Sequence, residues 1–362
     1  MRIRRDTRRR LDQFIANPAC QANVLSAVHD IPMAQVAASL LLDTQGGQSP
    51  FAIGRGVTFE RSLYADGATR LFAALVAAGV LSAAATGFVD LRLRLNGGTV
   101  ASLDEACARF HQLLLRFAAS EGEERASLPA LLAAPALRIP GRAILPDGMF
   151  AVDVVTVHPS GRPGPVVLRV GEIKVYPDRG GHTDPHQLAT TRAQAGIYVH
   201  ALRLAVAEAG VGDRVTVADD GFLVLTRPGS GAASVRAHED LGYQAQRAEV
   251  AFERLRQAAA LAEALPGDAD GEGVPAARLA VVSGAPTAYD EACVSFCELE
   301  GRCHAAAVAA GDAAILGRDV ARFLGTVRLD RAAALIDGAA AESPAEADFL
   351  RRAREALGMV AA

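Results

Sequence analysis

The stretch FAVDVVTVHPSGRPGPVVLRVGEIKV, residues 150–175, decides the fold class of this chain. Valine and isoleucine are frequent at both of its ends, and such β-branched residues favour extended structure. Its centre, HPSGRPG, is dense in residues that form turns. We therefore expect one strand near 149–157, a turn, and a second strand near 166–175.

Charged residues interrupt both of these apolar strands. Side chains alternate between the two faces of a strand, so Glu172 and Lys174 project together while Ile173 faces the other way. In the first strand Asp153 is a lone carboxylate, and a charge at a buried position is costly without a partner. A divalent cation such as Mg²⁺ or Mn²⁺, held by Asp153 and Glu172, would offset that cost. The alternative is an ion pair between Asp153 and Lys174.

Helical patterns surround the strands. We expect helices within 1–50, 59–85, 101–135, 184–210, 241–265 and 305–358. Asp184 is placed to cap the fourth of these, with Pro185 in its first turn. We expect a further strand at 221–227 that begins a hairpin. Residues 265–276 are expected to form a linker. The alternation of helices and strands predicts an α/β fold.

Polar residues on two helices complete a pattern. Gln194 and Tyr198 are four residues apart and so share one helical face. Upstream, Glu60 stands early in a helix after the glycine-bearing entry of IGRGVTFERSLY. The order Glu60, Asp153, Glu172-x-Lys174, Gln194-x₃-Tyr198 resembles the RecB-like branch of the PD-(D/E)XK nuclease superfamily, although many relatives carry histidine where Glu60 stands.

This resemblance implies a fold, an activity and roles for residues. The fold would be a restriction-endonuclease-like core, a central mixed sheet flanked by helices, with helical additions at both ends. Asp153, Glu172 and Glu60 would be metal ligands, with the carbonyl of Ile173 as a further one. Lys174 would be the catalytic lysine that orients the attacking water. Gln194 and Tyr198 would position the DNA strand and metal-bound waters.

Three cysteines lie close together in ACVSFCELEGRCHAAA, at positions 293, 297 and 303. Three thiolates cannot complete a four-ligand site, and Cys20 is a candidate for the fourth. A metal or cluster, rather than disulfides, is expected for this spacing in a cytosolic protein. Zinc bound by four cysteines, or by three with His304, and plain thiols are the alternatives. Cys107 fits a helical apolar pattern and reads as a small core residue.

An iron–sulfur branch of the RecB-like nucleases has a similar layout, with one cysteine before the nuclease core and three after it. It includes the CRISPR-adaptation exonucleases and the AddB-type repair nucleases. The resemblance therefore implies a [4Fe–4S] cluster on Cys20, Cys293, Cys297 and Cys303 that joins the two ends of the domain. It also implies four segments: a helical region with Cys20 and Glu60, the nuclease core, a linker with the cysteine cluster, and a helical tail, at 1–136, 137–265, 266–304 and 305–362.

Composition limits the remaining classes of function. The chain has 362 residues, 51% of them hydrophobic, which excludes a disordered protein. No apolar run is long enough to span a membrane and no secretory signal is present, so we expect a cytoplasmic protein. The net charge is −4, but six of the first ten residues are arginine, a cluster that suits phosphate contact. The phosphate-loop motif of ATPases is absent, so any helicase or defence-system partner would be a separate protein.

Together these features predict a metal-dependent deoxyribonuclease, acting on single-stranded DNA or DNA ends in repair or anti-phage defence, and more an exonuclease than an endonuclease. The alternative is a catalytically inactive subunit that binds nucleic acid or assembles a nuclease–helicase complex. The intact set of Asp153, Glu172 and Lys174 argues against that alternative. A sequence-specific restriction enzyme is a third reading, disfavoured by the Gln194-x₃-Tyr198 pair and the cysteine layout.

Overall fold

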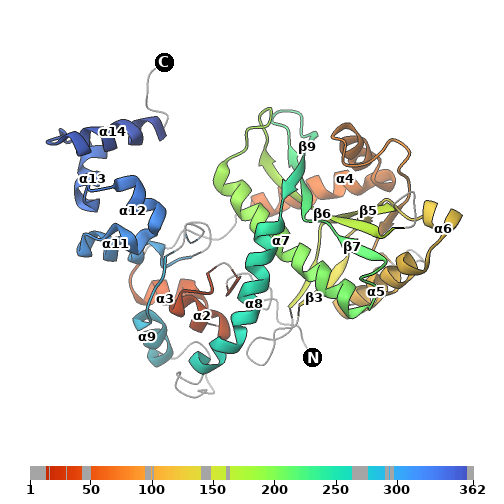
Figure 1. Cartoon of the computed structure of the whole chain (residues 1–362), viewed down its shortest axis with the longest axis horizontal. Coiled ribbons are helices and arrows are strands. Elements are labelled where there is room, and N and C mark those ends of the chain that lie inside the picture. Colours follow the sequence, from red (N-terminus) through yellow and green to blue (C-terminus); the bar gives the residue numbers. More distant parts are fainter. Residues whose placement is uncertain are drawn as a thin grey trace. The chain divides into compact units, whose positions relative to one another are not determined.

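The chain forms two compact units in the computed structural model (Figure 1). The larger unit takes Met1–Ile15 and Gly46–Ala259, and the smaller takes Ala16–Gln45 and Ala260–Ala362. The first helical segment, 1–136, thus contributes to both units. The arginine-rich start and most of the expected linker lie outside the described residues. The residues that the structure describes are 14–15, 17–29, 31–42, 50–93, 99, 102–139, 148–159, 164–262, 276–289, 293 and 297–356.

A mixed seven-stranded sheet is the centre of the larger unit. Its strands are β1 (Phe88–Asp90), β2 (Leu131–Ala133), β5 (Val154–Pro159), β6 (Val166–Pro177), β7 (Val215–Val217), β8 (Asp220–Thr226) and β9 (Ala233–Asp240). Their order is β1-β2-β5-β6-β8-β9, with β7 paired to β6. The β1–β2, β6–β7 and β6–β8 pairs are parallel and the others antiparallel. The prediction of an α/β fold with a mixed sheet and flanking helices is confirmed.

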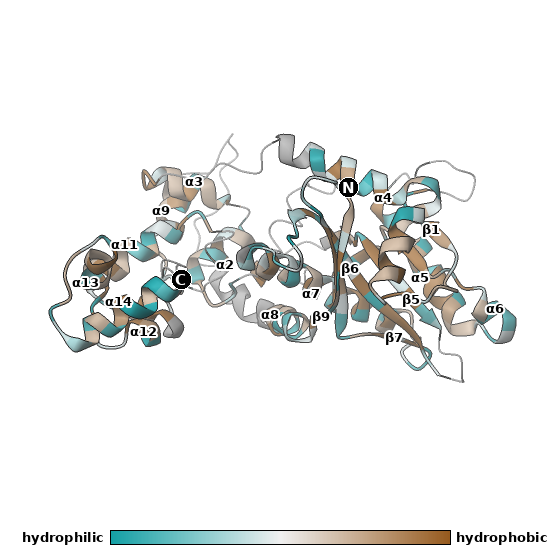
Figure 2. Ribbon diagram, turned by 90° about the horizontal axis from the view of Figure 1, so that it is seen from above, coloured by the Kyte–Doolittle hydropathy of each residue, from teal (hydrophilic) through white to brown (hydrophobic). Residues whose placement is uncertain are grey.

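Helices cover both faces of this sheet (Figure 1). Helix α4 (Pro50–Ala77) packs its buried side chains against Ile173 of β6 and Val224 of β8. Leu223 faces the opposite way and packs on Leu188 of α7 (Pro185–Glu208). The strands between these helices are mainly hydrophobic, as the brown colour of β5 and β6 in Figure 2 shows. A sheet that is buried on both faces requires such apolar strands.

The first expected strand is two strands. β4 (Gly148–Ala151) pairs with β3 (Ala136–Ile139) in a separate two-stranded sheet, whereas β5 begins at Val154 in the main sheet. The prediction of one continuous strand over 149–157 is therefore wrong. Asp153 stands at the break, and its carboxylate takes a hydrogen bond from the Ile173 amide instead of extending a ladder.

The expected helix over 101–135 is also shorter than predicted. α5 (Leu103–Ala119) ends before Ser120, and the short α6 (Gly122–Ala126) follows. Ser120 and Glu121 separate the two helices, because both are extended, with ψ of 138° and 161°. The expected helix at 59–85 is instead α4 over 50–77, and it is interrupted between Ala65 and Ala68. The break includes Gly67 at φ 68° and the non-glycine residue Asp66 at φ 52°.

The predicted caps and the hairpin are confirmed. Asp184 precedes α7, and its side chain accepts a hydrogen bond from the Gln187 amide at 2.9 Å, with Pro185 in the first turn. β8 and β9 form the expected antiparallel pair, and α8 (Gly242–Ala262) follows it as predicted.

The smaller unit is helical where it is described. Its elements are α2 (Gln21–Val28), α3 (Met33–Ser39), α9 (Ala276–Gly284), α11 (Glu300–Ala310), η1 (Ala313–Leu316), α12 (Arg318–Leu324), α13 (Leu329–Ile336) and α14 (Pro344–Ala356). The expected helical tail is thus a series of short helices, because Gly311, Gly317 and Gly325 take positive φ at their ends. In the part of the chain described, no helix has the length and apolarity needed to cross a bilayer.

A glycine on α7 allows α7 and α8 to approach closely. A Cβ added at Gly196 would lie 2.3 Å from Cβ of Gln244 and 2.7–2.9 Å from backbone atoms of Gln244 and Ala245. Alanine normally stabilises a helix interior by up to ~1 kcal/mol relative to glycine. Here the contact with backbone overrides that gain, and Gly196→Ala is expected to lower the free energy of unfolding by about 2 kcal/mol. Urea unfolding followed by circular dichroism measures this.

Gly56 on α4 is the matched control for this substitution. A Cβ at Gly56 has no atom within 4 Å, so Gly56→Ala should leave stability unchanged or raise it slightly. Equal effects of the two alanines on unfolding would show that the α7–α8 approach does not constrain Gly196.

Candidate active site

The register of β5 and β6 brings two of the predicted carboxylates opposite each other. Val154 pairs with Gly171, so the next positions along the antiparallel strands are Asp153 and Glu172. The Ile173 amide donates a hydrogen bond to Oδ2 of Asp153 at 2.9 Å. Asp153 is therefore joined to β6 through the residue between Glu172 and Lys174.

Glu172 and Lys174 form a close ion pair on β6. Nζ of Lys174 lies 2.6 Å from Oε1 of Glu172, whose side chain is fully buried. Ile173 packs into the core under α4, so its two neighbours face the side of the sheet that α7 covers. The alternative pairing of Lys174 with Asp153 alone is not what the structure has, although Asp153 acts on Lys174 through its charge.

The protonated state of Lys174 is favoured at this position. Burial lowers the pKa of its ammonium group, but the charges of Glu172 and Asp153 raise it more, so the pKa lies above its ordinary value. Lys174 therefore stays charged at neutral pH. About a quarter of its side chain, 24%, is exposed to solvent.

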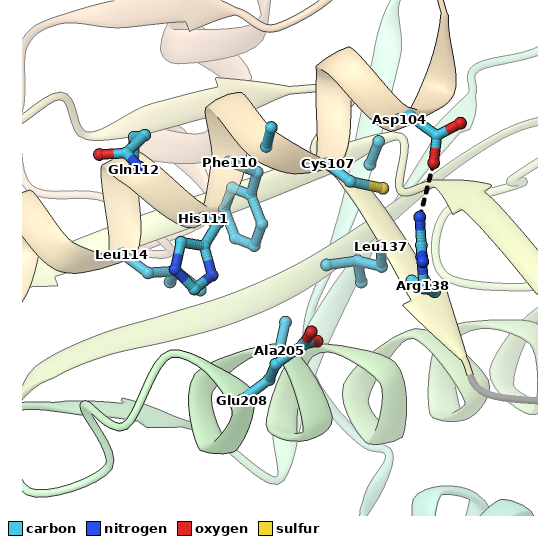
Figure 3. A pocket seen from close by; sticks show the side chains of 12 residues that line it. Asp104, Cys107, Phe110, His111, Gln112, Leu114, Leu137, Arg138, Ala205 and Glu208 are labelled. Atoms are coloured by element: carbon cyan, nitrogen blue, oxygen red, sulfur yellow. Dashed lines mark hydrogen bonds and ion pairs between the residues drawn. The ribbon is translucent and has the colours of Figure 1, made fainter.

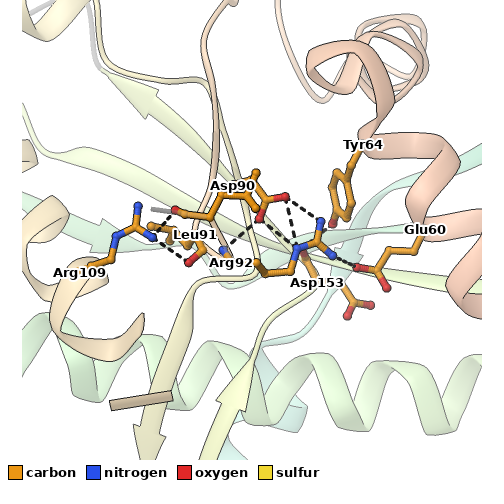
Figure 4. A network of polar contacts seen from close by, with 8 residues as sticks. Glu60, Tyr64, Asp90, Leu91, Arg92, Arg109 and Asp153 are labelled. Atoms are coloured by element: carbon orange, nitrogen blue, oxygen red, sulfur yellow. Dashed lines mark hydrogen bonds and ion pairs between the residues drawn. The ribbon is translucent and has the colours of Figure 1, made fainter. Parts of the chain in front are cut away.

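Glu60 of α4 lies close enough to Asp153 for their charges to interact, but it is held by an arginine (Figure 4). Its Oε1 lies 2.8 Å from Nη1 of Arg92, and Nη2 of Arg92 lies 2.9 Å from Oδ2 of Asp90 at the end of β1. Burial and the nearby charge of Asp153 raise the pKa of Glu60, while Arg92 lowers it. Glu60 and Asp153 are thus electrostatic neighbours, and Asp90 and Arg92 interact with Glu60 as well.

Tyr64 lies one turn after Glu60 and ties α4 to the strand break. Its hydroxyl donates to the backbone carbonyl of Asp153 at 2.5 Å, and its ring stacks on Phe88 of β1 with centroids 5.8 Å apart. The Arg92 guanidinium also lies over the Tyr64 ring, with Cζ 4.8 Å from the ring centroid. Burial, followed by the charges of Asp153 and Glu60, raises the pKa of Tyr64 well above its ordinary value.

Gln194 and Tyr198 interact with each other on α7. Nε2 of Gln194 donates to the Tyr198 hydroxyl at 2.7 Å. Tyr198 is buried, and its ring lies 6.3 Å from that of Phe150 on β4. Gln194 is half-buried and is the more accessible member of the pair. The structure thus places Tyr198 in the core, where its hydroxyl orients Gln194.

A second buried carboxylate joins α7 to β9. Arg192 on α7 and Arg236 on β9 both bind Glu239, at 2.6 and 2.8 Å. Arg236 pairs in register with Leu223, which pairs in turn with Glu172, so this group lies on the same face of the sheet as the candidate site. The sequence shows charged residues between 236 and 239, but it does not indicate that Arg192 on α7 contacts Glu239.

The donor set suits a hard divalent cation. Glu60, Asp90, Asp153 and Glu172 bring four carboxylates, and Arg92 and Lys174 bring two positive charges. The formal sum is −2 when all are ionised, and carboxylate oxygens are the ligands that Mg²⁺ and Mn²⁺ prefer. Among the described residues, no three His, Cys, Asp or Glu side chains already stand close enough to hold an ion. Glu60 in particular is turned to Arg92.

The four predicted cysteines gather in the smaller unit. Asn17, which is buried, donates to Sγ of Cys293 at 3.3 Å and accepts from the Cys20 amide at 3.2 Å. Cys20 and Cys297 belong to one apolar cluster with residues of α2, α3 and α9. All five cysteines of the chain are described, and none is in a disulfide. Asn17 is a residue that sequence reasoning did not find.

The thiols of this group oppose one another's ionisation. A hydrogen bond with Cys293, followed by burial, raises the pKa of Cys297, and the charge of Cys20 adds to it. Burial raises the pKa of Cys303, with further contributions from Cys20 and Cys293. Buried thiols that cannot ionise together without a cation fit a metal or cluster, since binding drives their deprotonation. Cys20, Cys293, Cys297 and Cys303 are therefore chemically suited to a thiolate-bound centre.

Cys107 belongs to another place. It lines a cavity of about 380 Å³ between α5, β3 and α7, together with His111, Arg138 and Glu208 (Figure 3). Burial raises the pKa of its thiol to about 11. Cys107 lies on α5 in the larger unit, whereas the other four cysteines belong to the smaller unit, so Cys107 is not part of the four-cysteine group.

Comparison with known proteins adds no relative to this description. No family model, no curated protein and no solved structure matches the chain. The candidate site therefore stands on its own residues and geometry.

Proposed function

We propose that this chain is a metal-dependent nuclease with a PD-(D/E)XK core of the RecB-like type, which hydrolyses phosphodiester bonds in DNA. The observation that carries the proposal is the ion pair of Lys174 with the fully buried Glu172, 2.6 Å apart and opposite Asp153. A buried carboxylate is costly, and a strand-to-strand arrangement of two carboxylates and one lysine is the arrangement that metal-assisted phosphoryl chemistry uses.

Asp153, Glu172 and Glu60 would hold Mg²⁺ or Mn²⁺, with the Ile173 carbonyl as a further donor. When bound, the cation polarises a phosphate oxygen and lowers the pKa of a water molecule. Lys174 keeps its proton, because its pKa is raised, and its ammonium group would orient water and offset negative charge at the phosphate. Gln194, oriented by the buried Tyr198 hydroxyl, supplies an amide beside the strand.

We further propose that Cys20, Cys293, Cys297 and Cys303 bind a [4Fe–4S] cluster, with Zn²⁺ as the alternative occupant. The support is that Asn17 contacts both Cys20 and Cys293, that Cys20 and Cys297 share one apolar cluster, and that Cys303 interacts electrostatically with Cys20 and Cys293. The role is structural, because the centre would join segments far apart in the chain. Single-stranded DNA or DNA ends are the proposed substrate, in repair or defence together with a separate helicase or defence-system protein.

The first test is metal-dependent cleavage of labelled DNA. Purified protein is expected to degrade linear single-stranded DNA with Mn²⁺ or Mg²⁺ and to stop completely with excess EDTA, because Asp153 and Glu172 alone do not activate water. Gel analysis of a linear strand and the same strand as a closed circle separates exonuclease from endonuclease action. Degradation of the linear strand alone is the expected result.

Asp153→Asn and Asp219→Asn form the matched pair for this assay. Both remove one carboxylate, but Asp219 lies on the surface, where it is 74% exposed. Only Asp153→Asn should abolish cleavage. DNA binding without any cleavage, under every metal tested, would instead support the inactive-subunit alternative.

A further inference from the structure

Arg92 has an unusual position for an arginine beside a candidate metal site. It bridges two carboxylates from different elements, Glu60 on α4 and Asp90 on β1, at 2.8 and 2.9 Å (Figure 4). Nε of Arg92 also donates a hydrogen bond to Oδ1 of Asp90 at 3.0 Å. Two guanidinium nitrogens therefore contact Asp90, whereas one contacts Glu60. Asp90 is the stronger anchor of the two.

We propose that Arg92 is a positioning residue that competes with the divalent cation for the carboxylate of Glu60. This inference rests on the proposed function, since it concerns the metal site of that reaction. Arg92 satisfies Glu60 when no metal is bound, and Glu60 exchanges this partner for the metal on binding. Arg92 then remains beside the site, held by Asp90.

The charges around Glu60 favour such an exchange. Asp153 lies close enough to Glu60 for their charges to interact and is the carboxylate that the metal would share with it. The Glu60–Arg92 contact is partly exposed, with 33% and 43% of the two side chains accessible, and an ion pair of this kind is weak enough to be replaced. The bidentate contact with Asp90 and the stacking on Tyr64 keep Arg92 from leaving the site.

Arg92 also explains why Glu60 does not already converge with the other carboxylates. Four carboxylates in one region repel one another, and Arg92 reduces that repulsion on the side of Glu60 and Asp90. Lys174 has the same effect for Glu172. Each half of the site therefore has its own cation, and only the Arg92 half must open for Glu60 to become a ligand.

The test is the affinity of metal-free protein for Mn²⁺, measured by electron paramagnetic resonance without DNA. Arg92→Gln is expected to bind Mn²⁺ about threefold to tenfold more tightly than the wild type, because Glu60 no longer has a competing partner. Arg61→Gln is the charge-matched control. Arg61 follows Glu60 on α4, and its side chain is exposed. Its substitution should therefore change the affinity for Mn²⁺ by less than about twofold.

A double-mutant cycle separates competition from a general effect of charge. In the Glu60→Gln background, Arg92→Gln should lose its effect on Mn²⁺ affinity down to the size of the Arg61→Gln control. Arg92→Lys, which keeps the charge without the fork, should give an intermediate affinity and serves if Arg92→Gln does not fold.

The outcomes distinguish this inference from the proposed function. If Mn²⁺ binds the wild type in a manner that Asp153→Asn abolishes, but Arg92→Gln binds it equally or more weakly, then Arg92 does not compete for Glu60 and the inference is overturned. An Arg92 effect of unchanged size in the Glu60→Gln background overturns it as well. If Asp153→Asn leaves Mn²⁺ binding unaltered, the metal site itself is wrong, and both proposals fail.

Discussion

Lys174→Met is expected to reduce the rate of DNA cleavage by about 100- to 1,000-fold at saturating metal, since a positioned charge that acts on the transition state is lost. The same substitution breaks the ion pair between Lys174 and the fully buried Glu172. Breaking a buried ion pair by removing one member costs about 3 kcal/mol or more in folding free energy. A loss of activity in this variant alone would therefore not separate catalysis from unfolding.

The double variant Glu172→Gln/Lys174→Met makes that separation. Glutamine and methionine have nearly the volumes of the residues they replace, and neither is charged, so most of the lost stability should return. Thermal unfolding followed by circular dichroism measures the recovery. Cleavage should stay as low as in Lys174→Met. A stable double variant that still cleaves DNA would show that the pair is only a structural ion pair of the sheet.

Cys297→Ser and Cys303→Ser are expected to abolish the proposed metal centre of the smaller unit. Wild-type protein purified without oxygen should contain about four iron and four sulfide per chain and show the charge-transfer absorption of a cluster. Both serine variants should lose iron and unfold at a midpoint lower by about 10 °C or more, because a link between Cys20 and Cys293 closes a very long loop. Iron analysis and calorimetry measure these two quantities.

Cys107→Ser is the control for the cysteine variants. Cys107 lies on α5 in the larger unit, whereas the four-cysteine group belongs to the smaller unit, so its substitution should leave the iron content unchanged. About one zinc per chain in place of iron would select the alternative occupant. Protein without iron or zinc, and with the same unfolding midpoint in all three variants, would exclude a metal centre on these cysteines.

Local signals were sufficient for the elements that bear the candidate site. β-branched residues around a turn predict the β5–β6 pair, and Asp184 with Pro185 predicts the start of α7. These predictions hold because turn formation and capping depend on neighbouring residues. The break of the strand at Asp153 could not be predicted in the same way. It depends on a hydrogen bond from Ile173, twenty residues further along the chain.

In the candidate site, too, local sequence signals predict some residues, whereas only the packing of distant elements reveals the others. The alternation of side chains in β6 places Glu172 and Lys174 together without any knowledge of the rest of the chain. Tyr64, Asp90 and Arg92 became evident only from the packing of α4 against β1, since nothing in the spacing of these residues indicates that they meet. FVDLRLRL, at 88–95, reads as an ordinary edge strand when taken alone.

The sequence by itself therefore determined which reactive groups this protein carries. They are carboxylates and a lysine at strand spacing, one cysteine near the start of the chain and three towards its end. Only the tertiary structure decided which of these groups are partners. It joins Glu60 to Arg92 instead of to Asp153, and it brings Cys20 to Cys293 through Asn17. The physical reason is the separation along the chain over which each interaction acts. Strand alternation and helix capping act over a few residues, whereas an ion pair between α4 and β1 exists only once both elements have packed on a common core.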